Sequence, residues 1–129
     1  MLRVSRLDHL VLTVADIDAT VEWYSNVLGM SRVTFGEGRT ALRFGNQKIN
    51  LHLAGHEFEP RAAVATRGSA DLCFIVDDDL DGVRAQLAAN GVAVELGPVV
   101  RTGATGQLDS VYVRDPDGNL IELSNYQAD

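Results

Sequence analysis

The chain has 129 residues, a formal net charge of −7 and a hydrophobic fraction of 46%. This length fits one domain with a modest core, or two small modules that share one. The acidic balance without a basic stripe argues against nucleic acid and membrane surfaces as partners. The single cysteine, Cys73, excludes an intramolecular disulfide, as expected of a cytoplasmic protein.

The first half of the chain predicts a strand, a helix and three further strands. Asp16 is a suitable N-cap and Gly29 a suitable C-terminal stop for the helix. Alternation of apolar and polar residues predicts the strands, and the last of them carries a histidine, His52. The expected ranges are strand 7–14, helix 17–28, and strands 32–35, 40–44 and 48–54.

The second half predicts the same order again. Asp79 caps a helix that ends at Asn90 and Gly91, and the turn at 115–118 precedes the last strand. The expected strands are 69–76, 92–96, 110–114 and 119–124. The Gly-containing segment 97–109 is interpreted as a loop that forms a lid.

Fixed spacings indicate an internal repeat. Asp71 follows His9 by 62 residues, and Glu122 follows His52 by 70. Such offsets are typical of a duplicated supersecondary unit. The predicted fold class is therefore α+β, with two βαβββ repeats forming a cupped mixed sheet and the helices outside. Residues 1–129 are expected to be one domain, with repeat one at about 5–54, a linker at about 55–68 and repeat two at about 69–125.

Four metal-competent side chains occupy first or last strands of the repeats: His9, His52, Asp71 and Glu122. Each lies on the strand face opposite the apolar residues. A lone strand histidine is more often packed or solvated than a ligand, and Asp71 can equally cap a strand start. Four such residues at positions matched by the repeat favour a site for one divalent ion with room for substrate.

The βαβββ order and two motifs resemble the vicinal oxygen chelate superfamily of glyoxalases, bleomycin resistance proteins and extradiol dioxygenases. The motifs are HLVLTVADIDATVEWYSNVLGM at 9–30 and VRDPDGNLIEL at 113–123. A short glyoxalase-domain branch is the nearest likeness. The resemblance implies that His9 is a metal ligand and that Glu122 is both a ligand and a base. The chain departs from glyoxalase I at His52, where Glu or Gln is usual, and at Asp71, where His is usual.

The expected function is that of a metal-dependent lyase or isomerase of the lactoylglutathione lyase type. One divalent ion (Ni, Co, Zn, Mn or Fe) would help stabilise an enediolate formed from a small substrate with neighbouring oxygens. Glu122, with Asp71 as the alternative, would move the proton. Tyr112, Arg43 and Arg101 are candidate substrate contacts.

Two other functions remain open from the sequence. His9, His52 and Glu122 would also suit a ring-cleaving Fe(II) dioxygenase. A non-catalytic protein that binds a small antibiotic-type molecule is the third reading. The two repeats that form a site can come from one chain or from two, since the linker is long enough for either. We expect a homodimer, whose sites combine the first repeat of one subunit with the second repeat of its partner.

Overall fold

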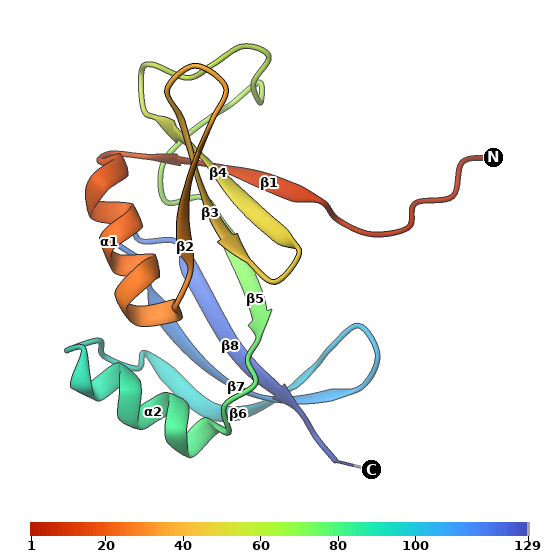
Figure 1. The fold of residues 1–129 in the computed structure, drawn as a ribbon. Helices are drawn as coiled ribbons and strands as arrows, with labels where there is room; N and C mark the ends of the chain where they lie inside the picture. Colours follow the sequence, from red (N-terminus) through yellow and green to blue (C-terminus); the bar gives the residue numbers. More distant parts are fainter. Residues whose placement is uncertain (129) are drawn as a thin grey trace. The chain divides into compact units, whose positions relative to one another are not determined.

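The computed structural model describes residues 1–128, which form an α+β fold of eight strands and two helices. The chain divides into two compact units, Met1–Arg67 and a second that begins at Gly68. Each unit has the order strand, helix and three strands (Figure 1). The two predicted βαβββ units are therefore confirmed. No helix within residues 1–128 is long and apolar enough to cross a membrane.

The first unit contains one mixed sheet with strand order β1-β4-β3-β2. The strand β1 runs parallel to β4, and the other neighbours are antiparallel. The elements are β1 (His9–Val14), α1 (Ile17–Leu28), β2 (Ser31–Phe35), β3 (Arg39–Phe44) and β4 (Gln47–Leu53).

One face of this sheet packs under α1. The Asp16 side chain accepts from the backbone N–H of Ala19 at the start of the helix. At its end Gly29 has φ of 67°, a left-handed conformation that favours glycine. Alternate strand residues point toward the helix and, with Tyr24 of α1, form the apolar core: Leu12, Val14, Leu42, Ile49 and Leu51. The remaining alternate residues form the opposite face, which is more polar.

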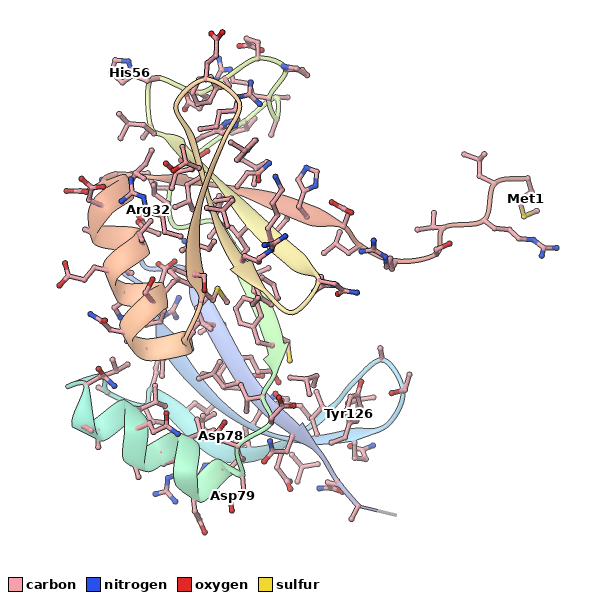
Figure 2. The ribbon with its side chains drawn as sticks, viewed as in Figure 1. Met1, Arg32, His56, Asp78, Asp79 and Tyr126 are labelled. Carbon is pink, nitrogen blue, oxygen red and sulfur yellow. The ribbon has the colours of Figure 1, made fainter. Side chains whose placement is uncertain are left out.

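The second unit repeats this architecture with strand order β5-β8-β7-β6. Asp79, labelled in Figure 2, lies at the start of α2, where its side chain accepts from the backbone N–H of Gly82. The core comprises Val83, Leu87, Val111, Val113, Ile121 and Leu123. The elements are β5 (Asp71–Ile75), α2 (Leu80–Ala89), β6 (Leu96–Thr102), β7 (Gln107–Arg114) and β8 (Leu120–Tyr126).

The predictions for 92–96 and 97–109 are wrong. The strand lies at Leu96–Thr102 and pairs with β7, which begins at Gln107, so most of the expected lid is a β-hairpin. The Gly97–Pro98 pair suggests a loop in the sequence. In the fold β6 is an edge strand with a register shift between Leu96 and Val99, and edges and bulges are where a strand tolerates proline.

Strand pairing also corrects the alignment of the repeats. His9 pairs with Lys48, and Asp71 pairs with Leu120. The first strands are therefore offset by 62 residues, as predicted, but the last strands are offset by 72 and not by 70. The counterpart of Glu122 is Asn50, and the counterpart of His52 is Ser124. The error arises because Ile49, Leu51 and Leu53 alternate with period two, so the apolar pattern looks the same after a shift of two residues.

Candidate functional site

His9 lies on the polar face of the first unit, and its ring is oriented by a neighbouring carboxylate. Its Nδ1 lies 2.8 Å from Oδ1 of Asp8, and this hydrogen bond is the main reason that the pKa of Asp8 is lowered. A ring that donates from Nδ1 keeps Nε2 as an acceptor, the arrangement in which histidine binds metals. Lys48 and Arg43 stand in the same row across β4 and β3.

Asn50 lies on the same face as His9, in the next row along the strands. It pairs with Val11 on one side and with Ala41 on the other, and its side chain is only 9% exposed. Among the buried side-chain oxygen and nitrogen atoms of residues 1–128, Asn50 Oδ1 is the one without a hydrogen-bond partner. A buried acceptor without a donor is destabilising, so this oxygen is available to a cation or to a donor group of a ligand.

His52 lies on this face too, but it is packed rather than open. It is 7% exposed, and its ring packs against that of Phe58 in a T-shaped arrangement at a centroid distance of 5.6 Å. The guanidinium of Arg39 stacks on the same phenyl ring at 4.4 Å. Burial, followed by the charge of Arg39, lowers the pKa of His52.

The strand register separates the two histidines. His9 is level with Lys48, which precedes His52 by four residues on the neighbouring strand. Four residues of strand span about 13 Å, and side chains stand nearly perpendicular to the sheet. Two metal–nitrogen bonds of about 2.1 Å do not bridge that separation. Asn50 is offset from His9 by only two residues.

The second unit carries the matching acidic pair, Asp71 and Glu122, on one face of its sheet. Glu122 pairs with Cys73 on β5 and with Tyr112 on β7. Asp71 lies two residues before Cys73, so it is offset from Glu122 as His9 is from Asn50. Partial burial raises the pKa of the Cys73 thiol, so this cysteine is not an activated nucleophile.

Two serine hydroxyls contact the Glu122 carboxylate. Ser110 Oγ donates to Glu122 Oε2 at 2.7 Å and lies 2.6 Å from Ser124 Oγ. Both serines are fully buried. Ser124 Oγ also lies 3.4 Å from Sγ of Cys73.

The three candidate substrate contacts fall on these two faces. Tyr112 is directly opposite Glu122, and its hydroxyl accepts from Nε of Arg101 at 2.9 Å. Arg43 is opposite Lys48 in the first unit. His56, by contrast, points outward from the loop after β4 (Figure 2).

The described residues 1–128 contain no cluster of three or more His, Cys, Asp or Glu side chains that could hold a metal ion. Each unit holds only part of the predicted set: the first places His9 one row from Asn50, which was not predicted, and the second places Asp71 one row from Glu122. Sequence reasoning missed Asn50, Ser110 and Ser124. The signal for Asn50 was an amide within the apolar run INL, on the same strand face as His52.

A family model matches residues 6–123, and the chain belongs to that family, the Glyoxalase/Bleomycin resistance protein/Dioxygenase superfamily. Virulence protein STM3117 of Salmonella typhimurium is 55% identical over 123 residues, covering 95% of this chain and 85% of that protein. Glyoxalase domain-containing protein RDO1 of Mycosarcoma maydis is 56% identical over 126 residues, or 98% and 71% of the two chains. A structure from the mobile metagenome of V. Pseudocholerae has a TM-score of 0.97 at 58% identity, covering 99% of each chain.

More distant relatives include enzymes. A probable lactoylglutathione lyase of Vibrio cholerae is 33% identical over 138 residues, covering 95% of this chain and 93% of that protein. Biphenyl-2,3-diol 1,2-dioxygenase 3 of Rhodococcus globerulus is 31% identical over 120 residues, covering 92% and 62%. Members of the superfamily thus include lyases and dioxygenases that act on small molecules.

Proposed function

We propose that the protein is a metal-dependent lyase or isomerase of the glyoxalase type, with one divalent ion held by His9, Asn50, Asp71 and Glu122. The observation that carries this proposal is the strand register. It gives His9 with Asn50, and Asp71 with Glu122, the same places in the two units. The proposed ligand set keeps three of the predicted residues and takes Asn50 in place of His52.

The chemistry of these side chains fits such an ion. Asn50 Oδ1 is a buried acceptor without a protein donor, and His9 is oriented through Asp8. One imidazole, one amide oxygen and two carboxylates make an oxygen-rich donor set. Carboxylate and carbonyl ligands suit Mn(II) better than the softer ions, so Mn(II) leads the metals predicted from the sequence.

The choice of Asn50 over His52 as a ligand also helps to distinguish the alternative functions. The Fe(II) sites of non-haem oxygenases use two histidines and one carboxylate. The proposed set has a single imidazole, which disfavours ring cleavage. The packing of His52 against Phe58 supports a structural role for that histidine.

When bound, the ion would hold two neighbouring substrate oxygens and stabilise the negative charge that develops on them. Glu122 would take the proton from the substrate carbon that bears the hydroxyl and return it to the adjacent carbonyl carbon, while the hydroxyl proton passes to the former carbonyl oxygen. Tyr112, held by Arg101, would donate a hydrogen bond to the substrate beside Glu122. Arg43 and Lys48 would attract an anionic part of the substrate on the first unit.

Because the proposed ligands come from both units, the site requires a first unit and a second unit to face each other. We propose a homodimer in which the two come from different subunits. We also propose a cytoplasmic location, which the unpaired Cys73 supports.

The test is activity of the Mn(II)-loaded protein on two substrates. One is the hemithioacetal of methylglyoxal and glutathione, and the other is a catechol with oxygen uptake recorded. We expect thioester formation from the first, no oxygen uptake with the second, and loss of turnover in Glu122→Gln. Ring cleavage of the catechol, or tight substrate binding without turnover, would contradict the proposal in favour of one of its rivals.

A further inference from the structure

We infer that Ser110 and Ser124 are positioning residues, which hold the Glu122 carboxylate by one oxygen and keep the other for the reacting group. The inference rests on the role proposed for Glu122, and all of its contacts lie within the second unit. Ser110 and Ser124 are both 0% exposed, so neither hydroxyl can exchange its protein partners for bulk water.

The direction of the hydrogen bonds follows from counting protons. A serine hydroxyl has one proton to donate. Ser110 gives its proton to Glu122 Oε2 at 2.7 Å, so at its 2.6 Å contact with Ser124 it must accept. At that contact Ser124 therefore donates, and its hydroxyl is also directed at Glu122 Oε2, 3.4 Å away. The Cys73 side chain lies 3.4 Å from Ser124 Oγ and also interacts with the Glu122 carboxylate. The result is a chain of donors that ends on the carboxylate.

Both serine hydroxyls contact the same carboxylate oxygen. Ser124 Oγ is 3.4 Å from Glu122 Oε2, the oxygen that Ser110 also binds. The two serines thus anchor the carboxylate through Oε2, and neither serine hydroxyl occupies Oε1. A base held in this way needs little reorganisation at the moment of reaction.

The first unit shows what this position looks like without the serines. There the counterparts of Glu122, Ser110 and Ser124 are Asn50, Arg39 and His52. Arg39 and His52 pack on Phe58, and Asn50 Oδ1 has no partner among the described residues. The duplicated units therefore differ: the acidic residue is held by hydroxyls only in the second.

The experiment compares Ser110→Ala, Ser110→Thr and Ser124→Ala with the parent protein. Thr20→Val is the matched control, because Thr20 is also buried and bonds the Asp16 carbonyl at 2.9 Å, away from Glu122. Two readouts are used. NMR side-chain couplings report the rotamers of Glu122 in metal-free protein, and calorimetry with Mn(II) alone reports its affinity.

In Ser110→Ala we expect Glu122 to average over several rotamers and Mn(II) affinity to fall on the order of tenfold. Ser110→Thr should restore both, Ser124→Ala should give a smaller loss, and Thr20→Val should change neither. A single unchanged rotamer in both alanine variants would overturn the inference, whether or not Mn(II) binds. A parent protein that binds no Mn(II) would overturn the proposed function, and the rotamers would still decide the role of the serines.

Discussion

Replacing Asn50 with leucine should stabilise the metal-free protein. The side chain is 9% exposed between Val11 and Ala41, and its Oδ1 has no donor within residues 1–128. An unsatisfied buried polar group costs about 1–3 kcal/mol, and an apolar group of similar shape removes that cost. We therefore expect the free energy of unfolding to rise by about 1–2 kcal/mol, measured by urea denaturation in the presence of a chelator.

Asn119→Leu is the matched control for this prediction. Asn119 is 1% exposed, but its Oδ1 accepts from the backbone N–H of Ala70 and its Nδ2 donates to Asp115. Its replacement leaves buried groups unpaired and should destabilise the protein by about 2 kcal/mol or more. If Asn50→Leu destabilises the protein to the same extent as Asn119→Leu, then Asn50 is an ordinary structural amide and the reasoning about its free oxygen is refuted.

Three further predictions concern the hairpin, pH and assembly. Gly97 has φ of 114°, and a Cβ at this position would overlap the Ser110 carbonyl oxygen, so Gly97→Ala should destabilise the protein by about 2 kcal/mol or more. Gly118 has φ of 87° with no atom within 4 Å of a Cβ, so Gly118→Ala should cost only about 1 kcal/mol in the same urea titration. Burial lowers the pKa of His52 in the folded state, so the unfolded chain takes up a proton first as pH falls below about 6.5. The free energy of unfolding of the metal-free protein should therefore decrease as the pH falls through this range. An equal decrease in His52→Gln would contradict this prediction. If each site combines repeats from two subunits, refolding His9→Ala together with Glu122→Ala should restore Mn(II) binding to about a quarter of the sites. Mixed dimers without any restored site would rule out sites formed between subunits.

Much of the fold was predictable because local signals and tertiary structure agree. Asp16 and Gly29 bound α1 at the predicted residues, and Asp79 caps α2 as expected. The edge strand β6 escaped prediction because Gly97 and Pro98 are typical of loops, and only the bulge on a sheet edge makes them compatible with a strand.

The candidate site was predictable only in part, because ligand positions depend on register. His9 and Asp71 were matched by an offset that the helix and its glycine stop confirm. The last strands contain only a period-two apolar pattern, which does not distinguish offsets of 70 and 72. Pairing of β1 with β4 and of β5 with β8 shows that the offset is 72, which makes Asn50, and not His52, the counterpart of Glu122.

Titration with Mn(II), followed by the electron paramagnetic resonance signal of the free ion, tests the central claim most directly. Parent protein, His9→Ala, Asn50→Ala, His52→Ala and Glu122→Ala would be compared at neutral pH. The proposed ligand set predicts one ion per pair of units in the parent. It also predicts weaker binding on the order of tenfold or more in the His9, Asn50 and Glu122 variants, with near-parent binding in His52→Ala. Loss of binding in His52→Ala together with full binding in Asn50→Ala would contradict the account.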